Sequence, residues 1–186
     1  VCLEKDSDGK PMFKRSGKDY EKFPESYQLY RELLAKQPDN SVTIISTGFS
    51  TNLARLMDSG ADKYSKLTGM ELISKKVKLL VTMAGHMGDP NFHEYNVKKD
   101  IQAAKKVFEH WPTPIVTSPF EVGIAIEYPA KSIENDFGWA AHHPVVEAYK
   151  HYIKMPYDRP TWDLTAVLYA VEGGSYFTLS PSGTIK

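Results

Sequence analysis

Residues 84–99 hold the densest group of side chains that could take part in chemistry. They follow an apolar run and combine imidazole, amide and carboxylate groups at short spacing: His86, Asp89, Asn91, His93, Glu94 and Asn96. Such a density of donors and acceptors suits a ligand rich in hydroxyl groups or a bound metal ion. The alternative is a solvated loop held by Asx turns, which is the commoner fate of a long polar loop. The unusual length of this loop favours a function.

Trp162-Asp163 is a second candidate, at the expected start of a helix. An aspartate there caps the helix and interacts with its dipole, so by itself it indicates structure rather than function. His142 and His143 are adjacent and would not share a helix face, which argues against a joint metal site.

Several common catalytic and binding motifs are missing. The chain has neither glycine-rich phosphate-binding pattern, which argues against a nucleotide phosphate cradle. No HExxH pattern or Cys/His cluster indicates zinc. Ser118 and Ser180 lack the context of a serine nucleophile, so hydrolysis through a serine is disfavoured.

Three β-rich apolar runs must position the candidate residues: 42–46, 77–83 and 114–117. Each precedes a helical pattern, and this alternation predicts βα units. Right-handed crossovers then bring the carboxyl ends of the strands to one edge, where open sheets bind ligands. Thr47-Gly48, the 84–99 loop and Ser118-Pro119 are therefore expected together. The predicted fold is α/β, an open and mostly parallel twisted sheet with helices on both faces, in a single domain over residues 1–186.

Apolar side chains at helical spacing predict helices that begin near Ser26, Ser50, Asp100, Phe120, Pro144 and Asp163. Ser50 and Asp100 are the expected N-terminal caps. Leu33, Ile101 and Tyr152 are among the side chains expected to face the core. Near the end of the sequence, 176–179 and 184–185 are expected to be strands joined by a turn.

Composition excludes some classes of partner. The 186 residues carry 23 Lys plus Arg and 23 Asp plus Glu. Balanced charge provides no field that would attract nucleic acid or an anionic membrane. No apolar run approaches the roughly 20 residues of a membrane span. The single cysteine, Cys2, rules out an internal disulfide and leaves both the cytoplasm and the periplasm open.

Four short motifs occur in an order that resembles the nucleoside hydrolases, the calcium-using N-ribohydrolases of the inosine-uridine-preferring type. The resemblance covers residues 42–126 and resumes at 162–170. The motifs are Thr47-Gly48-x-x-Thr51-Asn52-Leu53-Ala54, Met83-Ala84-Gly85, Glu94-Tyr95-Asn96-Val97, and Asp100 with Ala103-Ala104 and Val107-Phe108.

The resemblance implies that the intact protein hydrolyses the N-glycosidic bond of ribonucleosides or related ribosides, with calcium as cofactor. The backbone carbonyl of Thr47 and the carboxylate of Asp163 would be calcium ligands. Calcium accepts such oxygens together with water and vicinal ribose hydroxyls.

The resemblance also implies a binding site for the sugar. Glu94 and Asn96 would hydrogen-bond ribose hydroxyls, and Met83 would line the sugar pocket. Asn91 would be the counterpart of an upstream ribose-binding asparagine. Trp162 replaces the histidine that protonates the leaving base in many members, and an indole N–H is a poor acid that could instead stack on a base.

A D-x-D-x-x-x-D-D cluster, which supplies most calcium ligands and the general base of the family, has no counterpart in the chain. Asp6 and Asp8 lie in a polar turn with no buried strand before them. We therefore expect an N-terminal strand and helix to be missing, the catalytic base to be unknown within this sequence, and this chain alone to be inactive.

Two other functions remain open. The protein could be a non-catalytic homologue that binds a ribose or nucleoside, which Trp162 favours. It could also be an interaction protein that reuses the fold, in which case Glu94, Asn96 and Asp163 need not converge. The sequence is compatible with a homo-oligomer and does not decide the oligomeric state.

Overall fold

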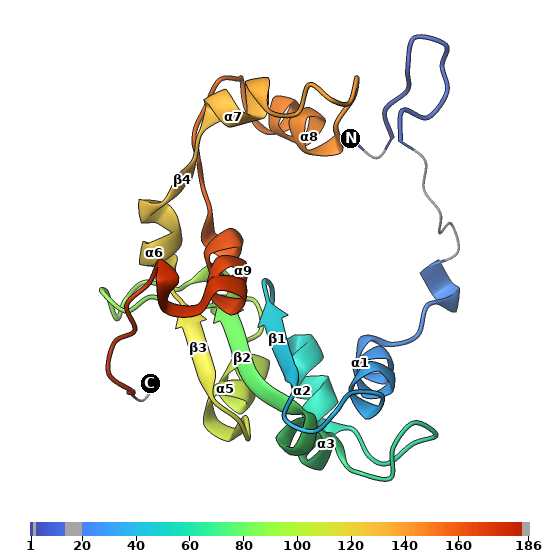
Figure 1. Cartoon of the computed structure of the whole chain (residues 1–186), viewed down its shortest axis with the longest axis vertical. Coiled ribbons are helices and arrows are strands. Elements are labelled where there is room, and N and C mark those ends of the chain that lie inside the picture. The colour runs from blue at the N-terminus through green and yellow to red at the C-terminus, as the bar shows by residue number, and fades with distance from the viewer. Residues whose placement is uncertain (2, 14–19, 184–186) are drawn as a thin grey trace. The chain divides into compact units, whose positions relative to one another are not determined.

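A computed structural model describes residues 1, 3–13 and 20–183 and contains a parallel sheet of three strands (Figure 1). β1 (Val42–Ser46), β2 (Val77–Met83) and β3 (Ile115–Ser118) lie in the order β1-β2-β3. Ser46 pairs with Thr82, and Met83 pairs with Ser118, so the three strands end at one edge. The predicted α/β class and the shared carboxyl edge are confirmed.

The chain divides into two compact units, Pro24–Ala125 with Thr161–Lys186, and Val1–Phe23 with Ile126–Pro160. Within its described residues, the larger unit contains the parallel sheet and the following helices: α1 (Ser26–Ala35), α2 (Thr51–Asp58), α3 (Gly69–Lys76), α4 (Tyr95–Lys98), α5 (Ile101–His110), α6 (Phe120–Ala125), α9 (Trp162–Glu172) and the 3-10 turn Gly173–Ser175.

The smaller unit pairs β4 (Glu127–Tyr128) with β5 (Arg159–Pro160) in antiparallel fashion. It also contains α7 (Ala130–Asn135), α8 (Pro144–Tyr152) and the 3-10 turn Tyr20–Lys22. The Asp158 carboxylate accepts a bond from the Ala130 N–H at 2.8 Å, which ties the start of α7 to the chain before β5. A single domain over residues 1–186 stays a prediction.

Both faces of the parallel sheet are covered, because its strands are apolar on both sides. One face packs on α1, α2, α3 and α5 through Leu56, Ile73, Leu80 and Val107, each at most 1% exposed. The other face packs on α9, where Ala166 is fully buried against Val81 and Met83. The start of α9 therefore lies near the carboxyl ends of the strands.

The ends of several helices differ from the sequence prediction. Ser50 makes no side-chain cap bond, because its own backbone is already helical, whereas Asp100 caps α5 as predicted. The sequence predicted a helix end at Lys75, Lys76 and Lys78 but not the start of α3, where Thr68 and Glu71 form a capping box. The loop prediction over 84–99 was wrong for its last part, which is α4.

Some predicted core residues and a predicted strand were also wrong. Leu33, Ile101 and Tyr152 are 51, 59 and 62% exposed. Tyr176–Leu179 forms no strand, since no neighbouring strand pairs with it in the described chain. The second strand expected there, at 184–185, and Cys2 lie outside the described residues. No helix in the described ranges has the length and apolarity to cross a membrane.

Arg31 on α1 is the fully buried cation of the larger unit's core. Its guanidinium lies 2.8 Å from the Asp62 carboxylate and donates to the carbonyls of Ser65 and Leu67 at 3.1 and 2.8 Å. These bonds fasten the segment between α2 and α3 to α1. A buried charge with this many partners is costly to disrupt from one side.

We predict that Arg31→Ala lowers the free energy of unfolding by about 3–5 kcal/mol, because Asp62 and two carbonyls lose their partner. Chemical denaturation measures the change. Arg55→Ala is the matched control, since Arg55 pairs with Glu25 at the surface and its loss should cost less than about 1 kcal/mol. Equal losses in the two variants would contradict the role assigned to Arg31.

Candidate functional site

The carboxyl end of β2 is held by a side chain from α4. Asn96 donates from Nδ2 to the carbonyl oxygen of Met83 at 3.1 Å, and its Nδ2 lies 3.2 Å from the Met83 sulfur. Met83 is 3% exposed. The structure thus brings together two of the predicted sugar-binding residues and fixes the orientation of the Asn96 amide, with Oδ1 as its remaining acceptor.

Glu94 is 4% exposed, and its carboxylate binds three backbone N–H groups. Oε1 accepts from Asn96 at 2.9 Å, whereas Oε2 accepts from Gly85 at 3.2 Å and from Val97 at 3.1 Å. Glu94 therefore caps α4 and fastens it to the chain that leaves β2. A carboxylate offers about four lone-pair positions, two on each oxygen, so one position on Oε1 stays available for a ligand.

Asp163 lies at the start of α9; the residue as a whole is exposed, but protein atoms partly surround its carboxyl group. The pKa of its carboxyl is raised, first by partial burial and then by the negative charge of Glu94. This effect of Glu94 agrees with the position of α9, which packs against the end of β2 through Ala166 and Met83. Asp163 forms no ion pair with Lys, Arg or His in the described part of the chain.

The start of α9 is fastened to β3 by two buried hydroxyl groups. Thr165 lies 2.6 Å from Ser118 between Oγ atoms and donates to the Trp162 carbonyl oxygen at 2.7 Å. Both threonine and serine are less than 9% exposed. This bond places Trp162 and Asp163 at the carboxyl edge of the sheet.

Thr47 directly follows β1, whose last residue pairs with Thr82. It is exposed, and its position next to the end of β2 agrees with the predicted edge. α9 packs against β1, β2 and β3, so Asp163 lies on a helix that contacts the strand after which Thr47 follows.

Trp162 packs closely against α6. A Cβ added at Gly123 would lie 2.3 Å from the Trp162 Cα and 2.4 Å from its Cδ1, so only glycine fits there. The Trp162 ring lies 5.7 Å from the Phe120 ring, and its indole nitrogen is buried without a hydrogen-bond partner in the described chain. The ring is thus held rigidly, with its N–H directed at no protein acceptor.

Asn91 is exposed in the loop between β2 and α4, where its N–H binds the Asp89 carboxylate at 2.9 Å. No hydrogen bond of the described residues joins its side chain to Glu94 or Asn96. That the Asn91 side chain lies close to Glu94 and Asn96 therefore stays a prediction.

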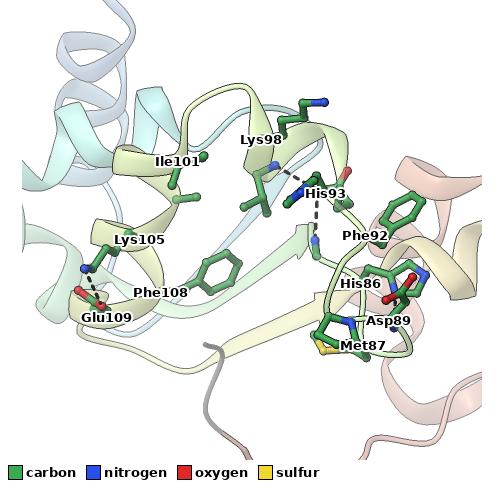
Figure 2. Close-up of a pocket in the computed structure, with 15 residues that line it drawn as sticks. His86, Met87, Asp89, Phe92, His93, Lys98, Ile101, Lys105, Phe108 and Glu109 are labelled. Atoms are coloured by element: carbon green, nitrogen blue, oxygen red, sulfur yellow. Dashed lines mark hydrogen bonds and ion pairs between the residues drawn. The ribbon is translucent and has the colours of Figure 1, made fainter.

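A cavity of about 700 Å³ opens beside Glu94, between the loop and the helices α4 and α5. Figure 2 shows Ile101, Lys105 and Phe108 on the helix side, opposite Met87 and Phe92 on the loop side. Its lining includes Glu94 but not Met83, Asn96 or Asp163. The cavity therefore borders the predicted ribose site at Glu94.

The sequence prediction missed α6 as part of the site. Phe120 contacts Trp162, Gly123 accommodates it, and Glu121 binds the loop that follows β2. The sequence did contain a signal for this, because Ser118-Pro119 was predicted to lie at the edge and the helix that follows it must begin there.

One other group could hold a metal ion by geometry. Glu4, Glu147 and His151 of the smaller unit have ligand atoms within 4.8 Å of one another. Glu147 already binds Lys150 at 3.0 Å, and His151 contacts Glu4 directly. These ion pairs occupy one oxygen of each glutamate, while the second oxygen of Glu4 is buried without a hydrogen-bond partner among the described residues. None of the three residues was a predicted site residue.

The family model described as inosine-uridine preferring nucleoside hydrolase matches residues 8–184. No curated protein matches the chain.

The raised pKa of Asp163 predicts a pH-dependent stability in the absence of metal. The charged form of this carboxyl is less favourable in the folded than in the unfolded chain, so its ionisation lowers the free energy of unfolding. This loss is absent below the unfolded-state pKa of about 3.9 and is complete once the pH lies above the raised folded-state pKa. Asp163→Asn should therefore raise the melting temperature at pH 7, with a difference that shrinks at acid pH.

Glu71→Gln is the contrasting control in the same melting experiment. Its bonds to the Thr68 backbone and hydroxyl lower the pKa of Glu71, so its charged form supports folding at neutral pH and the variant should melt earlier. A chelator keeps both measurements metal-free. An unchanged or lower melting temperature for Asp163→Asn at pH 7 would contradict the assignment.

Proposed function

Because the chain belongs to the inosine-uridine preferring nucleoside hydrolase family, whose chemistry is the hydrolysis of nucleoside N-glycosidic bonds, we propose a calcium-assisted ribonucleoside hydrolase. The substrate is a ribonucleoside or a related riboside. Glu94, Asn96, Met83, Asn91 and Trp162 bind it. Thr47 and Asp163 bind the metal.

The convergence of Glu94 and Asp163 carries the proposal. Glu94 binds Gly85 after β2, and the contact between Ser118 and Thr165 brings the start of α9, with Asp163, to the same edge. The charge of Glu94 acts to raise the pKa of the Asp163 carboxyl, and a bound cation would relieve this repulsion. Asp163 has no such cation among its described protein neighbours. The residues present therefore fit a hard cation with oxygen ligands.

On the sugar side, Glu94 and Asn96 each keep a hydrogen-bond acceptor position that no described protein donor uses. Glu94 can accept one further hydrogen bond at Oε1, and Asn96 can accept at Oδ1 while its Nδ2 holds Met83. Two fixed acceptors at one edge suit two hydroxyl groups of a ribose. The charge of Glu94 would also stabilise the positive charge that develops on the sugar ring in glycosidic cleavage.

On the metal side, the Thr47 carbonyl and the Asp163 carboxylate are the residues that would hold calcium. Calcium there would supply orientation of the ribose hydroxyls and a lower pKa for a bound water. The carboxylate that accepts a proton from that water is expected outside this sequence, and this expectation stays a prediction.

Trp162 favours a second candidate function. Its indole N–H cannot serve as an acid at neutral pH, and its ring is fixed by Gly123 and Phe120. A ring held in this way can contact a base without assisting its departure. A homologue that binds nucleosides without hydrolysing them would have this feature, and calorimetric binding without product would identify it.

We predict that the protein, together with any segment that precedes Val1 in its gene, hydrolyses nucleosides in a manner that depends on added calcium. Asp163→Ala should lower kcat/KM on the order of 100-fold or more, because a metal ligand is lost. Chromatographic detection of the free base measures turnover. Asp58→Ala is the control, since Asp58 pairs with Lys106 at the surface, and its activity should match that of the wild type. Indifference of activity to Asp163→Ala would refute the proposal.

A further inference from the structure

Glu121, in the first turn of α6, contacts the middle of the loop that joins β2 to α4. One oxygen, Oε1, accepts hydrogen bonds from the N–H groups of Met87 at 2.5 Å and Gly88 at 2.6 Å. The same oxygen lies 3.2 Å from Nδ1 of His86. One carboxylate oxygen therefore binds the N–H groups of two consecutive loop residues, while Nδ1 of His86 accepts from the N–H groups of Gly88 and Asp89 at 3.2 and 2.9 Å.

We propose that Glu121 is a positioning residue for ligand binding. Its carboxylate holds Met87 and Gly88 and thereby sets the conformation of the loop from Gly85, which binds Glu94, to the predicted sugar-binding residue Asn91. The inference rests on the proposed function. Glu121 acts through the loop and is not assigned a contact with substrate.

The loop has few other restraints at its centre. Its beginning is tied by Gly85, whose N–H binds Glu94 at 3.2 Å and whose carbonyl accepts from the Phe120 N–H at 2.9 Å. Beyond Gly85, the described bonds other than those to Glu121 join loop residues to each other, as in Asp89 N–H to His86 and Asn91 N–H to Asp89. Glu121 therefore supplies the hydrogen bonds that fix the middle of this loop to the sheet and its helices.

Gly88 allows the loop to approach the carboxylate this closely. A Cβ at that position would lie 3.3 Å from Oε1 of Glu121 and 3.4 Å from the His86 ring. The first distance is tighter than an ordinary contact, so with a side chain at position 88 the Glu121 carboxylate would have to shift by a few tenths of an ångström. Glycine at 88 and the carboxylate at 121 thus act together.

The charge of Glu121 strengthens the contact. Burial acts to raise the pKa of the Glu121 carboxyl, but the N–H groups of its own backbone, Gly88 and Met87, together with His86, bring the pKa below its ordinary value. The group is therefore ionised at neutral pH, and hydrogen bonds to an ionised acceptor are stronger than neutral ones.

Aromatic packing extends the effect to the rest of the site. The His86 ring lies 4.4 Å from that of Phe92, and Phe92 lies 4.6 Å from Phe120, which in turn contacts Trp162. Figure 2 shows His86 and Phe92 side by side at the loop end of the cavity. A loop released from Glu121 would lose this packing together with the placement of Asn91.

The test compares Glu121→Ala and Glu121→Gln with the control Glu32→Gln. Glu32 is a partly exposed residue of α1 that pairs with Lys36. Amide hydrogen exchange at Met87 and Gly88 should accelerate in Glu121→Ala and accelerate less in Glu121→Gln, whose neutral amide oxygen still accepts. Glu32→Gln should leave both rates unchanged. Unchanged exchange in Glu121→Ala would overturn the proposal.

Kinetics on the same variants separate positioning from chemistry. Loss of a positioned binding loop should raise KM about 10-fold, the equivalent of one charge-assisted hydrogen bond, with kcat within about twofold. Partial recovery of KM in Glu121→Gln supports the role, whereas a fall in kcat at constant KM overturns it. If the wild-type protein turns over no nucleoside, the proposed function is refuted. The hydrogen-exchange rates at Met87 and Gly88 then test only whether Glu121 holds the loop.

Discussion

The buried carboxylate of Glu94 is the interaction on which the candidate site depends. A carboxylate with 4% exposure is stable only when its oxygens are hydrogen-bonded, and here three backbone N–H groups meet that need. The bonds join the chain after β2 to the first turn of α4. Asn96 follows within that turn and returns a bond to the Met83 carbonyl. One carboxylate group therefore organises the edge at which the strands end.

The parallel sheet explains why Asp163 lies near this group although it is distant in sequence. Strands covered on both faces require a helix on each, and α9 covers the face formed by Val81 and Met83. The bond between Ser118 and Thr165 fixes the end of α9 that carries Asp163. The negative charge of Glu94 then conflicts with that of Asp163 and, after partial burial, raises the pKa of the Asp163 carboxyl. Conflicts of this kind are typical of sites built for a ligand rather than for the fold alone.

The sequence predicted the elements with strong local signals. The apolar β-rich runs 42–46 and 77–83 form strands at the predicted residues, and the Asp100 cap begins α5. Predictions that rested on the residue types of a short segment alone were less accurate. Ser50 resembles a cap but is already helical, and Tyr176–Leu179 has β-rich residues but no partner strand. Strand formation depends on a neighbour that local sequence does not reveal.

The candidate site was predictable in part. The edge that gathers Thr47, the 84–99 loop and Ser118 followed from the alternation of strands and helices. The proximity of Glu94 and Asp163 did not, because it depends on which face α9 covers. Glu121 was missed for another reason: its partners are backbone N–H groups, which carry no signature in the sequence.

The central claim is that Glu94 and Asp163 form the two sides of one cation and ribose site. The most direct test is an NMR titration of the Asp163 carboxyl carbon. The account predicts a pKa above the usual range in the metal-free wild type, a lower value in Glu94→Gln, and a still lower value in the wild type with excess calcium. A pKa of Asp163 that is the same under all three conditions would contradict it.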